Sequence, residues 1–192
     1  MIFFTGDEHY SHTNRVGGII KYCNRPFDNI IDHDEGIIAN HNEVVGPRDI
    51  VIHNGDFSWK SVNRTIEMIK RLNGKHIMIR GSHDKVIMKI ARRQPDLFEY
   101  AGYIYELVVH NKYHITVCHY KMEVWPRSHY NSWHCFAHSH CKWESTGKSH
   151  DVGVDCNNFY PLSFDQLKNI MDAKPDNVNY VGARIGNKNV NR

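Results

Sequence analysis

The sequence has no long apolar run and no leader-like segment. No stretch approaches the roughly 18 apolar residues that a membrane-spanning helix requires. The opening residues, MIFFTGDEHYSH, carry neither the basic segment nor the long apolar segment of a signal peptide. We therefore expect a cytoplasmic protein without membrane contact.

Cysteine is scarce and irregularly spaced. No two of the five cysteines have C-x-x-C spacing, and their number is odd: Cys23, Cys118, Cys135, Cys141 and Cys156. This pattern argues against a disulfide framework and against a structural zinc ribbon. We expect free thiols that pack as small apolar side chains.

The chain also lacks an excess of charge of one sign. Its 24 basic residues against 21 acidic ones give a net charge of +3, too small by itself to indicate nucleic-acid binding. With 41% hydrophobic and 23% charged residues, the composition is that of a globular chain. We expect one domain over residues 1–174 and a polar tail over 175–192; the oligomeric state stays open.

Three apolar, β-prone runs each stop at a glycine: residues 1–5, 49–54 and 75–80. Their nearly continuous apolar character is typical of strands buried on both faces of a sheet. Helical spacing of apolar residues fills the gaps, at 30–46 and 61–74. The alternation predicts an α/β fold with a parallel central sheet and right-handed crossovers.

The second half of the chain is richer in strands. We expect two strands joined by a tight turn, two further short strands and a final helix, at residues 103–109, 113–119, 134–140, 151–155 and 163–173. The helix would begin at Ser163, a favoured N-cap residue.

Histidine is abundant, at 15 residues, and it gathers with carboxylates at predicted strand ends. Five strands are followed by such groups: Asp7 and His9, Asp56, Ser82 to Asp84, His119, and His138 with His140. One such residue is usually a turn or surface residue, but the carboxyl ends of strands are also where open α/β sheets bind ligands. The recurrence of histidines and carboxylates at five strand ends predicts a metal site. Mixed carboxylate and imidazole ligands favour Mn, Fe, Ni or Zn. The six residues other than those at 82–84 suffice for two ions if Asp56 bridges them.

In order and spacing, these motifs resemble the signature of the calcineurin-like metallophosphoesterases: D-x-H, G-D, G-N-H-D, H and G-H-x-H. The resemblance covers roughly residues 2–170 and is greatest to a small bacterial and phage-type branch. Segments that carry it include NRPF at 24–27, NEVVGPRDIVIHNGDFSW at 42–59, RLNGKHIMIRGSHD at 71–84 and DVGVDC at 151–156. The family fold is a β-sandwich flanked by helices, with metals at the C-terminal ends of strands.

The resemblance implies a role for each matching residue. The first metal would be held by Asp7, His9, Asp56 and His140, and the second by Asp56, Ser82, His119 and His138. His83 corresponds to the family's catalytic histidine beside the phosphate, and Asp84 would orient it. The implied reaction is hydrolysis of a phosphate ester, by preference a phosphodiester related to nucleotides or nucleic acid, through a hydroxide that bridges two divalent ions.

The chain departs from the family pattern at three positions. Ser82 stands where the family has an asparagine whose amide oxygen binds the second metal, and a serine hydroxyl is a shorter and poorer ligand. Ala137 replaces a glycine and Lys121 a proline, which leaves the ligands in place. The serine predicts a weakened second site, and it supports an alternative: a non-catalytic or weakened metallophosphoesterase fold that acts as a binding module.

Other residues are candidates for contacting the substrate. A guanidinium group can grip a phosphate, although most arginines are surface charges; the candidates are Arg25, Arg80 and Arg127. His12 and Asn14 follow the first motif at a spacing that the branch shares, and otherwise read as polar residues at a helix N-terminus. Trp125 and Trp133 could stack on a nucleobase, but packing is the commoner use of tryptophan.

Overall fold

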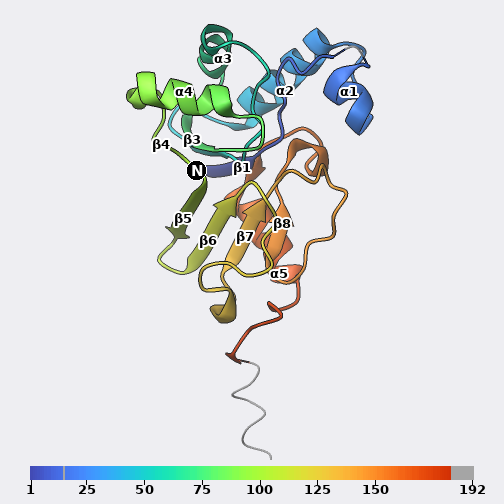
Figure 1. Ribbon diagram of the computed structural model, residues 1–192. Helices are drawn as coiled ribbons and strands as arrows, with labels where there is room; N and C mark the ends of the chain where they lie inside the picture. Colours follow the sequence, from blue (N-terminus) through green and yellow to red (C-terminus); the bar gives the residue numbers. More distant parts are fainter. Residues whose placement is uncertain (15, 183–192) are drawn as a thin grey trace, which may run out of the picture.

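Two sheets pack against each other, and helices cover the outer face of the larger sheet (Figure 1). The structure, a computed structural model, describes residues 1–14 and 16–182. The larger sheet has the strand order β4-β3-β2-β1-β9 and the smaller one β5-β6-β7-β8. The strands are β1 (Ile2–Thr5), β2 (Ile50–His53), β3 (Lys75–Ile79), β4 (Tyr100–Gly102), β5 (Ile104–Val109), β6 (Tyr113–Cys118), β7 (Trp133–Phe136), β8 (Ser149–Asp151) and β9 (Leu162–Ser163).

Most neighbouring strands run parallel. In the larger sheet β1, β2, β3 and β4 form parallel pairs, and only β9 pairs antiparallel, with β1. In the smaller sheet β6, β7 and β8 are parallel, whereas β5 forms an antiparallel hairpin with β6. The predicted α/β class, the parallel central sheet and the hairpin are therefore confirmed.

The core explains the continuous apolar runs of the first three strands. One face of the larger sheet contributes Phe4, Ile52 and Ile77 to a cluster that also contains Val117 of β6 and Leu167 of the last helix. The opposite face packs against helices through a second cluster. Since both faces of this sheet are buried, alternate polar positions are absent from its strands.

The helices and short 3-10 turns complete the fold. They are α1 (Gly18–Cys23), α2 (Ile30–Val44), α3 (Val62–Ile69), α4 (Lys85–Arg93), α5 (Phe164–Ala173), η1 (Pro95–Leu97), η2 (Ser128–Tyr130) and η3 (Val154–Cys156). The three predicted helices correspond to α2, α3 and α5, and Ser163 caps α5 in a capping box with Gln166. Helices α1 and α4 are additions; α4 begins directly after Asp84 and buries Ile87 and Ile90.

The strand predicted at 151–155 is wrong beyond its first residue. Strand β8 ends at Asp151, whose carboxylate accepts a hydrogen bond from the Gly153 N–H at 2.8 Å. The chain then turns into η3. Similarly, β7 ends at Phe136, so the histidines that follow it lie on a loop.

Part of the predicted polar tail packs on the domain. The buried side chain of Asn177 donates hydrogen bonds to the carbonyl oxygens of Ser128 and Ser132, at 2.9 and 3.0 Å. Residues 183–192 of the tail lie outside the described residues. Within the described part of the chain, none of the helices has the length and apolar character needed to cross a membrane.

Candidate metal centre

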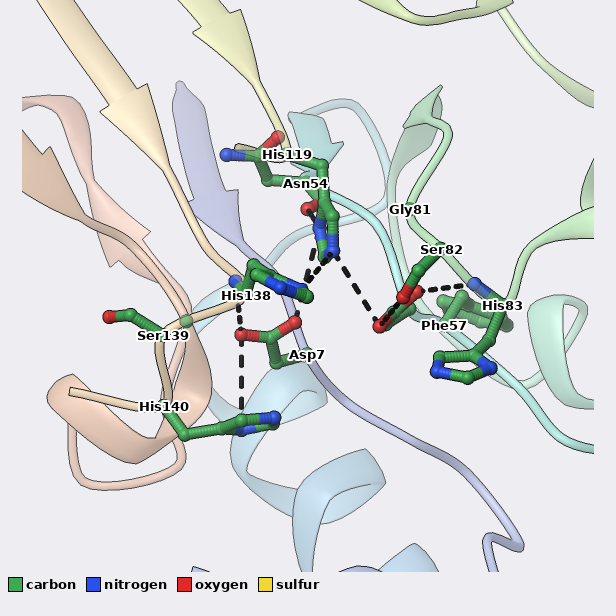
Figure 2. Close-up of polar contacts among 12 residues, drawn as sticks. Asp7, Asn54, Phe57, Gly81, Ser82, His83, His119, His138, Ser139 and His140 are labelled. Carbon is green, nitrogen blue, oxygen red and sulfur yellow. Dashed lines mark hydrogen bonds and ion pairs between the residues drawn. The ribbon is translucent and has the colours of Figure 1, made fainter. Parts of the chain in front are cut away.

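The structure brings six of the predicted ligands together in two groups at the carboxyl ends of the strands. Figure 2 labels four of them: Asp7, His119, His138 and His140. Each group offers one ligand atom per residue, and these atoms lie within 4.8 Å of one another. The groups are Asp7, His9 and His140, and Asp56, His119 and His138. They divide as the family resemblance implies for a first and a second ion.

Asp56 lies between the two groups. Its Oδ2 is 3.9 Å from His9 Nε2 in the first group and 3.6 Å from His119 Nε2 in the second. The Oδ1 atom of Asp56 accepts a hydrogen bond from the His83 N–H at 2.8 Å. One carboxylate oxygen is thus placed to be shared by cations on both sides.

Two of the histidines are held by hydrogen bonds through their Nδ1 atoms. His119 Nδ1 donates to the carbonyl oxygen of Asn54 at 2.7 Å, and His140 Nδ1 lies 2.8 Å from Asp155 Oδ2. Such a contact fixes the ring orientation. The other nitrogen of His119, Nε2, lies 3.6 Å from Asp56 Oδ2 and 3.2 Å from His138 Nδ1. Asp155 was not singled out from the sequence, although it lies in the DVGVDC segment.

Most of these residues have a backbone conformation that non-glycine residues rarely adopt. The φ angles of Asp7, His9, Asp56, His138 and His140 are 53°, 53°, 54°, 69° and 48°. Each residue in this conformation costs free energy. Such residues typically occur where a functional arrangement requires them. These angles turn the side chains inward directly after the strands end.

The donor set fits divalent cations. Asp7 Oδ1 and both ring nitrogens of His9 are buried and have no hydrogen-bond partner among the described residues. Burial, together with the nearby carboxylates of Asp151 and Asp56, raises the pKa of Asp7 well above its usual value. Buried polar atoms normally have partners, and a cation would satisfy Asp7 Oδ1 and one nitrogen of His9 and offset the carboxylate repulsion. The mixed nitrogen and oxygen donors suit a transition metal.

Ser82 lies beside the second group but bonds to a carboxylate. Its hydroxyl donates to Asp56 Oδ2 at 2.9 Å, the oxygen that faces both groups. The residue is exposed and lines the pocket above the histidines. The hydroxyl is therefore close to the predicted ligand position, and it uses its proton on Asp56.

His83 and Asp84 have separate positions. The His83 ring is exposed in the pocket, and its centroid lies 4.1 Å from that of Trp59. Asp84 is buried and does not orient this ring: its carboxylate accepts hydrogen bonds from the N–H groups of Asp56, Phe57 and Gly81, at 2.7, 3.0 and 2.8 Å. Burial raises the pKa of Asp84 to about 6, and these hydrogen bonds oppose the rise. Asp84 thus ties the Gly55-Asp56 loop to the Gly81 loop.

Arg25 is a positioning residue, and the phosphate contact expected from the sequence is not open to it. The side chain is buried, and all five of its N–H donors have partners. The guanidinium forms a bidentate pair with Asp155 and reaches the carbonyl oxygens of Asp7 and Glu8 and the ring of His33. Because Asp155 contacts His140, Arg25 holds this metal-facing histidine through a buried ion pair.

His12 and Asn14 both line the pocket with His83, as the sequence suggested. The His12 ring stacks on Trp59, with the centroids 3.7 Å apart and the planes at 5°. Asn14 Oδ1 accepts hydrogen bonds from the N–H groups of Val16 and Gly18, both at 2.9 Å, so it also shapes the turn before α1. The pocket has a volume of about 420 Å³.

The other candidates lie away from this pocket. Arg80 packs over the ring of Tyr103 and Arg127 over that of Tyr130. Trp125 and Trp133 are both 6% exposed, and Trp133 belongs to the core between the sheets. The packing interpretation of these two tryptophans is correct.

Two cysteines beside the site form a disulfide, so the prediction of free thiols is wrong for them. Cys141 directly follows His140, Cys156 directly follows Asp155, and their Cα atoms are 5.1 Å apart. Spacing alone did not reveal the pair, because the His140–Asp155 contact brings the two loops together. Cys118 and Cys135 are buried free thiols, as expected. Cys23 is also free, and it forms a third possible ligand group with His140 and Asp155, whose oxygens already accept bonds from Arg25.

Two proteins of unassigned activity are similar to the chain. No model of a known protein family matches it. The crystal structure of a protein of unknown function from Aquifex aeolicus, AQ665, shares the fold, with a TM-score of 0.66 and 23% sequence identity over 88% of this chain and 98% of that one. The uncharacterized protein MJ1445 of Methanocaldococcus jannaschii is 31% identical over 184 residues, which cover 89% of this chain and 91% of the relative. The chain belongs to the same protein family as MJ1445.

Proposed function

We propose that this protein is a calcineurin-like metallophosphoesterase that hydrolyses phosphodiesters with two divalent transition-metal ions. The observation that supports it most is the position of Asp56 Oδ2, within 4 Å of a histidine nitrogen in each of the two ligand groups. Bound there, such ions would polarise a phosphoryl oxygen and lower the pKa of water. Asp7, His9 and His140 would hold one ion, His119 and His138 the other, and Asp56 both, with Ser82 beside the second.

The residues of the chain prepare the pocket for an anionic ester. Besides the ligands His9, His138 and His140, the pocket is lined by His12 and His83, whose imidazole N–H groups can face the phosphoryl oxygens. A tilted contact with Trp59, at 37° between the planes, positions the exposed His83 ring, which belongs to neither ligand group. His83 is therefore the residue suited to donate a proton to the leaving oxygen.

Hydrolysis of bis(p-nitrophenyl) phosphate tests the proposal. We expect Mn²⁺-dependent release of p-nitrophenol that a chelator abolishes and that added Mn²⁺ restores. The monoester p-nitrophenyl phosphate should react more slowly if the pocket prefers diesters. A protein that binds Mn²⁺ but hydrolyses neither ester, with Mn²⁺, Fe²⁺, Ni²⁺ or Zn²⁺, would instead be a binding module.

Ser82→Asn should tighten the second metal site and raise kcat. An amide oxygen is a better ligand than a hydroxyl, and the pocket beside Ser82 has room for the longer side chain. Titration of the unaltered protein should show one tight and one weaker site, and the variant should bring the two affinities closer. Ser82→Ala is the control, since it removes the hydroxyl without adding a ligand.

Two outcomes would count against this assignment. If Ser82→Asn changes neither affinity nor rate, residue 82 does not stand at a ligand position. If the variant binds both ions tightly and still hydrolyses no phosphate ester, the result supports the binding-module alternative.

A further inference from the structure

Two exposed aromatic side chains line the same pocket as the metal-facing histidines. Tyr22 is 70% exposed and Trp143 57%, and both border the cavity of about 420 Å³ that also contains His138 and His140. A single exposed aromatic residue needs no explanation. Two of them on the wall of one pocket indicate a surface that a planar ligand covers.

Each ring stands beside one of the two ligand groups. The centroid of Tyr22 lies 6.2 Å from that of His140 in the first group, with the planes at 78°. That of Trp143 lies 6.3 Å from His138 in the second group, at 71°. Both rings thus meet the histidines edge to face, and neither is stacked on them.

The third aromatic residue of the pocket is already occupied. Trp59 has the ring of His12 at 3.7 Å and that of His83 at 4.1 Å, so it serves to position these histidines. The available stacking surface of the pocket therefore consists of Tyr22 and Trp143.

The loop that carries Trp143 is held at several points. The Cys141–Cys156 disulfide fixes its beginning. Lys121 Nζ donates a hydrogen bond to the Glu144 carbonyl oxygen at 2.6 Å, and Lys174 Nζ bonds to the Ser145 hydroxyl. Lys121, the residue that replaces the family's proline, therefore supports this loop. A held aromatic side chain loses little conformational entropy on binding a ligand.

Tyr22 is held through α1. Ile19 is 1% exposed, and its N–H bonds to the His12 carbonyl oxygen at 3.2 Å. Gly18 has a φ of 62° and approaches His12 so closely that a Cβ atom would collide with that carbonyl. Lys142, which also lines the pocket, places its ammonium over one face of the Tyr22 ring, 4.6 Å from the centroid, and adds positive charge to the wall. The opposite face of the ring is the one left for stacking.

We propose that Tyr22 and Trp143 bind a nucleobase, so that the substrate is a nucleotide phosphodiester whose phosphate lies on the metal-facing histidines. The inference rests on the proposed function and names its substrate class. Aromatic stacking accepts every base, because each has a π-face, so the site should show little base preference. Lys142 matches the negative charge of a nucleotide.

Binding of a nucleoside monophosphate, the product class, tests this without relying on catalysis. Calorimetric titration of the Mn²⁺-loaded protein compares adenosine 5′-monophosphate with ribose 5-phosphate, which differ only in the base. We expect the nucleotide to bind about tenfold more tightly, in the range typical of base stacking. Trp143→Ala and Tyr22→Ala should each reduce this ratio, and the double variant should bring it close to one.

Two matched variants control for packing. Trp143→Phe keeps a stacking ring and should keep most of the ratio. Tyr103→Ala removes an aromatic side chain of similar exposure, 60%, that lies outside this pocket, and it should leave the ratio unchanged. If a single-stranded oligonucleotide binds more tightly than a dinucleotide, the site takes a strand end. If the two bind equally, the site takes free nucleotides. Either result supports base recognition.

The outcome separates the two proposals. If the unaltered protein hydrolyses bis(p-nitrophenyl) phosphate but binds the nucleotide no better than ribose 5-phosphate, the nucleobase site is wrong and the phosphoesterase proposal stands. If no phosphate ester is hydrolysed but the ratio depends on Tyr22 and Trp143, the base site stands and the catalytic proposal fails.

Discussion

Asp56→Asn should remove most of the bound metal and all measurable phosphoesterase activity. The asparagine side chain has almost the same shape, and it can still accept the hydrogen bond from the His83 N–H. It loses the negative charge and one of the two carboxylate oxygens. Since Asp56 Oδ2 lies within 4 Å of a histidine nitrogen from each group, the loss affects both ions at once.

Elemental analysis of the purified variant, after equilibration with Mn²⁺, measures this effect directly. Asp172→Asn is the control, because it alters an exposed aspartate in α5 that pairs with Lys168 far along the chain from the ligands. The control should keep full metal content and activity. Full occupancy of two ions in Asp56→Asn would show that the assignment of the ligands is wrong.

His83→Ala should keep the metal and lower kcat by about 10²–10⁴, the usual effect of losing a positioned acid or base. The side chain belongs to neither ligand group, and the backbone N–H that bonds to Asp56 Oδ1 remains in the alanine variant. What disappears is the exposed imidazole beside Trp59.

Steady-state kinetics and metal analysis on the same preparation separate the possible roles. His129→Ala removes another exposed histidine, in η2, and should change neither quantity. Metal loss in His83→Ala would make His83 a ligand. An unchanged kcat with full metal content would remove it from catalysis.

The sequence predicted where the site lies better than how its parts contact one another. Each of the first three strands is an apolar run that stops at a glycine followed by polar residues, and this local pattern placed Asp7, Asp56 and Ser82 at one edge. Gly55 and Gly81 are required there by close approach: a Cβ on either would collide with the facing loop. The glycines themselves are visible in the sequence at the strand ends, but the groups that they approach, His119 and Asp56, come from other segments.

Contacts between distant segments were not predictable in the same way. Arg25 and Asp155 are 130 residues apart, and nothing near either residue shows that the pair is buried. The Cys141–Cys156 bond depends on that same meeting of loops. Left-handed backbone angles at aspartate and histidine leave no mark in the sequence, although they decide where these side chains point. Exposure also depends on contacts between distant segments, and the sequence did not show that Trp143, and not Trp125, is the exposed tryptophan at the pocket.

The arrangement of the ligands has a consequence for stability. Asp7, His9 and Asp56 follow strands of the larger sheet, whereas His119, His138 and His140 follow strands of the smaller one. Metal binding would therefore cross-link the two layers, in parallel with the Asn54 side chain, which donates to carbonyl oxygens of β6 and β7 at 3.2 Å.

Such a cross-link makes metal concentration a determinant of folding. A ligand that binds only the native state adds about 1.4 kcal/mol of stability for each tenfold excess over its dissociation constant. Chelation would remove this free energy and leave the buried carboxylates of Asp7 and Asp56 without a cation. We expect it to lower the free energy of unfolding, while the apolar core between the sheets continues to hold the two layers together.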